Sequence, residues 1–158
     1  MTLRALLGPD EKYEIYWEPY EKILDYIGYQ VKVANSVNKM LEALKEPYDL
    51  VLMEINQGSS HEVTYEPALK AYRKIEENVM KGRTKFFAIS DRRDLVKKTT
   101  ELTEEELKKY GLSSKIPAMS KDDFIMNEFK RIVNNSKLKS GRKQYDTCVK
   151  SAPIAGAL

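Results

Sequence analysis

Residues 50–53 constrain the fold of this chain more than any other segment. They are four consecutive apolar residues, Leu50, Val51, Leu52 and Met53, with no polar residue between them. A strand with one face in water alternates apolar and polar side chains, whereas an unbroken apolar run indicates a strand that is covered on both faces. Such strands occur in parallel sheets with helices packed on each side, so the segment favours an α/β protein.

Strand-like and helix-like patterns alternate along the rest of the chain. The predicted strands are residues 2–7, 29–34, 48–55, 84–90 and 115–120. Apolar residues at helical spacing predict helices over residues 16–27, 37–45, 66–80 and 125–135, and an interrupted helical segment over residues 91–111. Because a helix follows each strand, we expect a doubly wound, five-stranded parallel sheet with helices on both faces and right-handed connections.

Several residues predict where the helices begin and end. Ser36 is expected to cap the second helix, and Gly28 is expected to end the first. Thr103 and Glu106 match the S/T-x-x-E capping box, which starts a new helix within the interrupted segment. Together these signals predict one domain over residues 1–135. The basic tail over residues 136–158 has no sustained period, and we expect it to be disordered or ordered only with a partner.

The composition argues against several classes of protein. The 158 residues suffice for one hydrophobic core, and a formal net charge of +3 requires neither nucleic acid nor an acidic membrane as partner. With Cys148 as the single cysteine and His61 as the single histidine, an internal disulfide is impossible and a structural zinc site is not expected. No apolar run approaches the ~20 residues that cross a bilayer. We therefore expect a cytoplasmic protein without a membrane partner.

Motifs of the common α/β enzymes are missing. No G-x-G-x-x-G follows the first predicted strand, no GxxxxGK[ST] occurs, and no nucleophile elbow or acid/base pair is visible. We therefore expect no enzymatic activity and no catalytic residues. No cofactor is expected either, and Mg²⁺ is the one ion that the strand ends could bind.

Polar residues follow the predicted strands at the edge where α/β proteins bind their ligands. They are Asp10 and Glu11 after the first strand, Glu54 at the end of the third, Ser90 at the end of the fourth and Lys121 after the fifth. Clustered carboxylates need a hard cation such as Mg²⁺ or a lysine to neutralise them, and a hydroxyl with a lysine suits phosphoryl oxygens. This set of side chains fits the chemistry of an acyl phosphate on a carboxylate.

The chain resembles a response-regulator receiver domain of the CheY-like family. The segment GYQVKVANSVNKMLEALKEPYDLVLMEIN is similar to the receiver segment in which a Gly-Tyr or Gly-Phe precedes strand two, an alanine ends it, and DLVLMDI presents the phosphorylatable aspartate. The resemblance implies a flavodoxin-like fold with strand order 2-1-3-4-5. It places Glu54 at the phospho-acceptor position, with Ser90 as the switch residue and Lys121 as the phosphate-contacting lysine. It also places Asp10 and Glu11 near the metal-binding acidic pair.

Three departures from the family pattern indicate a degenerate receiver. The acceptor is a glutamate, LLGP precedes Asp10 where the family usually has acidic residues, and Asp122 follows Lys121 where the family usually has proline. Glutamate carries its carboxylate about 1.5 Å farther than aspartate, and phosphoryl transfer depends on positioning. The same reach lets Glu54 pair with Ser90 or Lys121 and imitate part of an activated state. We therefore expect a phosphorylation-independent pseudo-receiver that contacts a protein partner in a signalling pathway.

Other interpretations stay open. Glu54 and Lys121 could form a purely structural ion pair, Ser90 could cap the next helix, and Asp10 with Glu11 could be a solvated turn. The chain could also be a working receiver in a two-component phosphorelay.

The basic tail suggests a third class of function. Its positive residues are Lys137, Lys139, Arg142, Lys143 and Lys150. Such residues could associate with nucleic acid, although no aromatic residues alternate with them to stack on bases. The identity of the partner, the pathway and the oligomeric state do not follow from the sequence.

Overall fold

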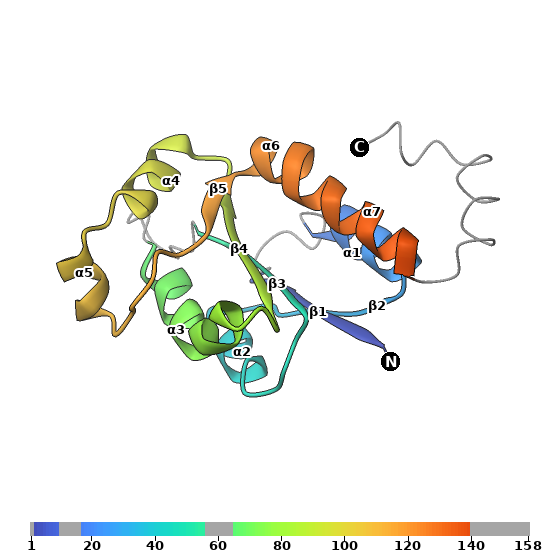
Figure 1. The fold of residues 1–158 in the computed structure, drawn as a ribbon, viewed down its shortest axis with the longest axis horizontal. Coiled ribbons are helices and arrows are strands. Elements are labelled where there is room, and N and C mark those ends of the chain that lie inside the picture. The colour runs from blue at the N-terminus through green and yellow to red at the C-terminus, as the bar shows by residue number, and fades with distance from the viewer. Residues whose placement is uncertain (1, 10–16, 56–64, 140–158) are drawn as a thin grey trace.

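The computed structural model describes residues 2–9, 17–55 and 65–139 of the chain. These residues form a five-stranded sheet in the order β2-β1-β3-β4-β5, in which all neighbouring strands are parallel (Figure 1). The strands are β1 (Leu3–Gly8), β2 (Tyr29–Val33), β3 (Leu50–Glu54), β4 (Lys85–Ser90) and β5 (Ala118–Ser120). The predicted doubly wound sheet and its strand order are therefore confirmed.

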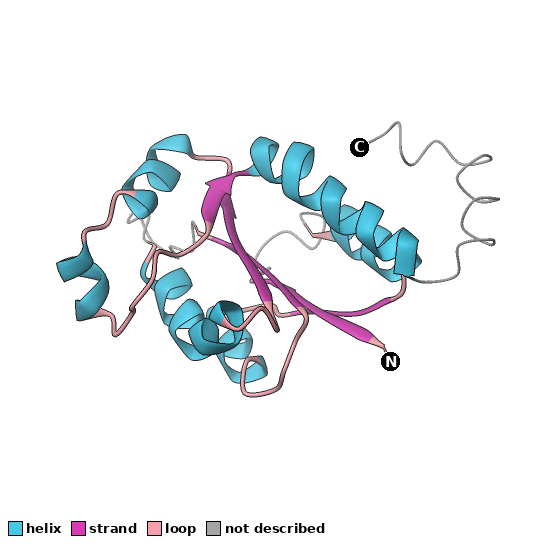
Figure 2. Ribbon diagram, in the orientation of Figure 1, coloured by secondary structure: helices cyan, strands magenta, loops and turns pink. Residues whose placement is uncertain are grey.

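Helices cover both faces of this sheet (Figure 2). On one face lie α1 (Glu18–Tyr26) and a C-terminal helix, which is continuous over residues 121–139. The C-terminal helix consists of α6 (Lys121–Asp123), the π-helical η1 (Phe124–Phe129) and α7 (Lys130–Lys139). On the other face lie α2 (Val37–Ala43) and α3 (Glu66–Met80), with α4 (Arg93–Thr100) and α5 (Glu104–Lys109) to one side of them. Within the described residues, no helix combines the length and the apolar character needed to cross a membrane.

The central strand β3 contains the apolar run of residues 50–53, and its position in the sheet accounts for that composition. Leu50 and Leu52 belong to the core cluster beneath α1 and the C-terminal helix, whereas Val51 and Met53 belong to the cluster beneath α2 and α3. Successive side chains of a strand point to opposite faces, so both halves of the run are buried. Each of these four residues is 0 or 1% exposed, so neither face of β3 is in contact with solvent along residues 50–53.

Helix ends lie largely where local sequence signals predict them. The Ser36 hydroxyl accepts a hydrogen bond from the Lys39 amide at 3.1 Å, and Thr103 with Glu106 forms both bonds of the capping box. Gly28 follows α1 with a φ of +106°, a left-handed conformation that a residue without a Cβ adopts freely. These caps confirm that the sequence marked the helix boundaries through side-chain chemistry.

The fifth strand is shorter than predicted. It begins at Ala118 rather than at residue 115, because Pro117 has no N–H to donate to the ladder. The Pro117 carbonyl still accepts a hydrogen bond from the Ala88 amide at 2.8 Å. A strand of three residues therefore suffices to bring Ser120 beside Ser90, its partner in the ladder.

The last helix is longer than predicted at both ends. It begins at Lys121 instead of residue 125, because the Ser120 hydroxyl accepts a hydrogen bond from the Asp123 amide at 3.2 Å and caps it. It continues through Lys139, past the predicted end at residue 135. Apolar periodicity alone missed the first turn, because Lys121 to Asp123 carry no apolar side chain.

The connection that carries α5 is fastened to α3. Glu76 accepts hydrogen bonds from the amides of Ser113 and Ser114 at 2.9 and 2.8 Å, and from the Ser114 hydroxyl at 2.7 Å. The hydroxyls of Tyr72 and Ser114 lie 2.9 Å apart and share a further hydrogen bond. The long segment between β4 and β5 is therefore a folded part of the domain.

Candidate functional site

The carboxyl ends of the parallel strands meet at one edge of the sheet, which is where α/β proteins bind their ligands. Glu54 is the last residue of β3 and Ser90 is the last residue of β4. Lys121 directly follows β5 and opens the C-terminal helix (Figure 1). Ser90 is buried at 1% exposure, whereas Glu54 and Lys121 are partly exposed. Three of the residues singled out from the sequence therefore lie at the same edge.

The end of β1 does not supply carboxylates to this edge within the described residues. β1 ends at Gly8, which pairs with Met53, the residue before Glu54. Gly8 has a φ of +146°, and a Cβ at this position would lie 2.6 Å from the Ala34 carbonyl oxygen. No larger residue fits there without a shift of the backbone, so an acidic side chain at position 8 is excluded.

The predicted metal ligands Asp10 and Glu11 lie outside the described residues. Among residues 2–9, 17–55 and 65–139, no group of three or more histidine, cysteine or acidic side chains is arranged to hold a metal ion. Magnesium binds chiefly through carboxylate oxygens and water.

Ser90 holds the turn that leaves β4. Its hydroxyl oxygen accepts a hydrogen bond from the Arg92 amide at 3.0 Å. The N-cap of α4 is Arg92, and this residue makes no side-chain capping bond, so the interpretation of Ser90 as a helix cap is wrong. Ser90 instead closes a turn two residues ahead of the helix, and this bond leaves its own O–H proton to donate.

Lys121 has an ion-pair partner that the sequence did not indicate. Its ammonium nitrogen lies 3.8 Å from a carboxylate oxygen of Asp91, the residue after Ser90. The side chains are 27% and 66% exposed, so water screens the pair and its contribution to stability is small. The pair nevertheless holds the lysine near the ends of β4 and β5.

Tyr20 on α1 also reaches this edge, and sequence reasoning missed its role. Its ring is buried against Trp17, Phe124 and Phe129, at centroid distances of 5.6, 6.0 and 5.2 Å. Its hydroxyl is buried and has no hydrogen-bond partner among the described residues. In the sequence, Tyr20 fits the apolar spacing of α1, so no signal separated it from an ordinary core aromatic.

Burial and nearby negative charges both act on the Tyr20 hydroxyl. Burial, together with the smaller effect of the negative charges of Asp91, Asp122 and Glu54, raises the pKa of Tyr20 from 10.0 to about 12. These carboxylates come from the loop after β4, from α6 and from the end of β3. The edge therefore combines a buried phenol, a buried serine, one lysine and carboxylates from three elements.

Other residues considered from the sequence lie outside the described part of the chain. They are His61, Arg142, Lys143, Cys148 and Lys150. Lys137 and Lys139 belong to α7.

Comparison with known proteins identifies the fold. No protein-family model matches the sequence, and no curated protein matches it. The structure is similar to the signal receiver domain of an HD domain-containing protein from Pseudomonas fluorescens Pf-5, with a TM-score of 0.54 and 15% sequence identity, over 89% of this chain and 100% of that chain. It is equally similar to a CheY-like response regulator receiver domain from Methylobacillus flagellatus, with a TM-score of 0.54 and 18% identity, over 86% and 99%.

A third similar structure is a CheY-like receiver domain protein from Methanospirillum hungatei JF-1, with a TM-score of 0.51 and 14% identity, over 89% of this chain and 100% of that chain. The described residues thus have the flavodoxin-like fold of CheY-like receiver domains, as the sequence resemblance predicted. At these identities the likeness defines the fold, and function has to be argued from the site.

Proposed function

We propose that this protein is a phosphorylation-independent receiver-like signalling module that acts through contact with a protein partner. One observation carries the proposal: a glutamate ends the central strand β3, and Gly8 with Pro9 stands at the neighbouring end of β1. The longer acceptor and the missing carboxylate at position 8 both work against phosphoryl transfer, which depends on accurate positioning and charge neutralisation. Binding of a protein partner requires neither an accurately positioned phospho-acceptor nor carboxylates that bind a metal ion.

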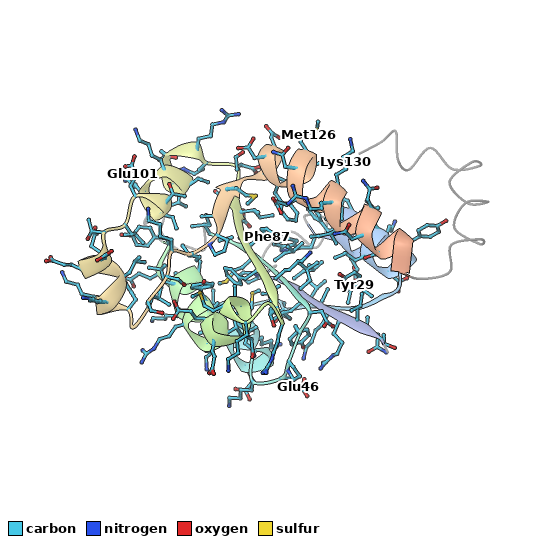
Figure 3. The ribbon with its side chains drawn as sticks, viewed as in Figure 1. Tyr29, Glu46, Phe87, Glu101, Met126 and Lys130 are labelled. Atoms are coloured by element: carbon cyan, nitrogen blue, oxygen red, sulfur yellow. The ribbon has the colours of Figure 1, made fainter. Side chains whose placement is uncertain are left out.

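The receiver-like face formed by β4, β5 and the C-terminal helix is a suitable contact surface. Met126 on this helix is 59% exposed and lies on its outer side, near Lys130 (Figure 3). Beneath the helix, the Phe87 ring on β4 packs against Phe124 at a centroid distance of 5.3 Å. A flexible, exposed methionine on a firmly packed helix is a common feature of protein-binding surfaces.

A working receiver is the second candidate function. It is favoured by Ser90 and Lys121, which stand at the ends of β4 and β5 where a phosphoryl group on residue 54 would need a hydroxyl and an ammonium. The two candidates differ in whether the site responds to phosphoryl chemistry. The reaction would transfer a phosphoryl group from a donor to the Glu54 carboxylate.

An amide NMR titration with Mg²⁺ and then beryllofluoride, which mimics an acyl phosphate, separates the two candidates. We expect no shifts of the Glu54, Ser90 and Lys121 amides in the natural protein. Glu54→Asp is the matched variant, because it shortens the side chain by one methylene and keeps the charge. Large shifts in the natural protein would contradict the proposal, and shifts only in Glu54→Asp would locate the block at the extra methylene.

A further inference from the structure

Two adjoining cavities form a groove at the amino end of the sheet, which we call the amino-end groove. Their volumes are about 420 and 250 Å³, and both are lined by Pro47, Tyr48, Asn78 and Thr84. The groove therefore lies between the loop that leads into β3 and the turn that leads into β4 (Figure 1). It is separate from the strand-end edge, because that edge is at the opposite ends of the same two strands.

The turn after α3 places an amide and a guanidinium on one wall of the groove. Gly82 follows α3 with a φ of +74°, the left-handed conformation with which many helices end. The backbone amides of Arg83 and Thr84 then both donate to the Asn78 carbonyl, at 2.8 and 3.3 Å. This turn holds Asn78 and Arg83 close together, and Lys74 lies four residues before Asn78 on the same face of α3.

Positive side chains outnumber negative side chains along the amino-end groove. The positive ones are Arg4, Lys45, Lys74 and Arg83, and the negative ones are Glu46 and Asp49. Glu46 lies 3.4 Å from the Arg4 guanidinium, and Asp49 accepts a hydrogen bond from the Arg4 amide at 2.8 Å. Both acids therefore already have a donor within the fold, and the groove keeps an excess of positive charge.

Two of the positive side chains have no counter-ion in the described part of the chain. Lys74 and Arg83 are both exposed, and neither forms an ion pair there. The charge of Arg83 helps to lower the pKa of Glu77, but the partner of Glu77 is Lys81, at 2.7 Å. The half-buried side-chain amide of Asn78 makes no hydrogen bond with any described residue either. These three side chains can therefore all donate to an anion that enters the groove.

The remaining lining of the groove distinguishes among anionic partners. Leu44, Pro47 and Ile75 give it an apolar wall beside Lys74. The Tyr48 ring is only 5% exposed, and the Arg4 guanidinium lies over it at 4.5 Å from its centroid, so it offers no open face on which a nucleobase could stack. An apolar wall with a positive rim is complementary to an acidic peptide that also carries an apolar side chain.

We propose that the amino-end groove binds an acidic segment of a protein partner. Carboxylates of the segment pair with Lys74 and Arg83, the Asn78 amide donates to a backbone carbonyl of the segment, and an apolar side chain of the segment packs against Pro47. The inference goes beyond the proposed function, because it assigns a second contact surface at the other end of the sheet. It does not depend on whether residue 54 accepts a phosphoryl group.

The test is an amide NMR titration at low ionic strength with the capped tripeptide glutamate-leucine-glutamate. We expect saturable shifts at Lys74, Asn78, Arg83 and Thr84, which weaken as salt is added. The capped tripeptide glutamine-leucine-glutamine keeps the shape and removes the charges, so it should bind about tenfold more weakly. The capped tripeptide glutamate-serine-glutamate lacks the apolar side chain and should bind severalfold more weakly than the leucine peptide.

Substitutions locate the binding site. Lys74→Gln and Arg83→Gln should each weaken binding of glutamate-leucine-glutamate about threefold, because each removes one exposed ionic contact. Lys98→Gln and Arg93→Gln are the matched controls, because they remove the same charges from exposed positions on α4, outside the groove. The two controls should leave the affinity unchanged. If all four variants bind the tripeptide equally well, the assignment of the groove as the binding site is wrong.

Three other outcomes would overturn the inference. They are no saturable shifts with glutamate-leucine-glutamate, equal binding of glutamine-leucine-glutamine, and tighter binding of inorganic phosphate or a single-stranded oligonucleotide, which would indicate a phosphate-bearing ligand. The beryllofluoride titration monitors the opposite end of the sheet. The proposed function and the acidic-peptide site can therefore fail independently of each other.

Discussion

The two ends of the sheet use polar side chains differently. At the amino end, these side chains fasten the chain: a carboxylate oxygen of Asp49 accepts the Arg4 amide at 2.8 Å, and the Thr84 hydroxyl donates to the Tyr48 carbonyl at 2.7 Å. The Arg4 guanidinium lies over the Tyr48 ring at 4.5 Å from its centroid. Each of these contacts joins residues that are far apart in the sequence, so the amino end contributes to stability.

At the carboxyl end, the hydrogen bonds of Ser90 and Ser120 are local, to amides two and three residues further on. The ion pair between Lys121 and Asp91 is long, at 3.8 Å. Within the described residues, each end also holds one buried tyrosine hydroxyl without a hydrogen-bond partner, Tyr48 at the amino end and Tyr20 at the carboxyl end. A cation lies over the Tyr48 ring, whereas negative charges of carboxylates help to raise the pKa of Tyr20. The amino end is therefore joined by hydrogen bonds between remote segments, whereas the described hydrogen bonds of the two serines at the carboxyl end are local.

The largest expected effect comes from removing the Tyr20 ring. Tyr20→Ala should lower the free energy of unfolding by about 3–5 kcal/mol, because it opens a cavity among Trp17, Phe124 and Phe129. Urea denaturation followed by circular dichroism measures this change. Tyr20→Phe, which keeps the ring, is the control and should stay within about 0.5 kcal/mol of the natural protein at neutral pH. A loss below about 1 kcal/mol for Tyr20→Ala would show that the ring is not part of the core.

A smaller effect is expected at alkaline pH. The folded pKa of Tyr20 is raised from 10.0 to about 12, so the unfolded chain ionises first as the pH rises. The un-ionised Tyr20 side chain therefore stabilises the folded state fully below pH 10. Between pH 10 and about 12 this part of the free energy of unfolding is lost, up to about 2 kcal/mol. The natural protein should therefore lose more stability than Tyr20→Phe across this range, as measured by urea denaturation at each pH. Parallel pH profiles for the two proteins would contradict the assignment of a raised pKa to Tyr20.

The smallest expected effects come from two substitutions, one at each end of the sheet, whose costs in stability can be compared directly. Thr84→Val should cost about 1–2 kcal/mol, because it leaves the buried Tyr48 carbonyl without the Thr84 hydroxyl. Ser90→Ala should cost less, about 0.5–1 kcal/mol, because the Arg92 amide that it leaves belongs to an exposed turn that water can reach. Urea denaturation of both variants provides the comparison. If Ser90→Ala lowers the free energy of unfolding as much as Thr84→Val or more, the Ser90 hydroxyl makes stabilising contacts beyond its hydrogen bond with the Arg92 amide.

Much of the fold could be predicted because its determinants are local in the sequence. The apolar run in β3 indicates burial on both faces, and the Thr103–Glu106 capping box marks the start of α5. Predictions failed at two boundaries that neither the apolar spacing nor a recognised capping motif marked. The capping of Lys121 to Asp123 by Ser120 is one example, and the late start of β5 after Pro117 is another.

The candidate site was predictable in part. Parallel strands present their carboxyl ends at one edge of the sheet. This rule was enough to predict that Glu54, Ser90 and Lys121 lie at the same edge. The same rule says nothing about a residue in the first turn of a helix, such as Tyr20 in α1. Tyr20 therefore could not be found, since its periodicity is that of a core residue and only the packing of α1 shows where its hydroxyl lies.

The sequence by itself determined the alternation of strands and helices, the caps, and the residues that end the strands, because each of these depends on neighbours within a few positions. The tertiary structure alone decided that Asp91 pairs with Lys121, that Gly8 lies too close to Ala34 to be replaced by an acid, and that Tyr20 packs against the aromatic rings of the C-terminal helix. These facts depend on distances between segments that are remote in the chain. Such distances are set only when the sheet and both helical layers pack together, because packing determines how closely the backbones approach and which side chains can touch.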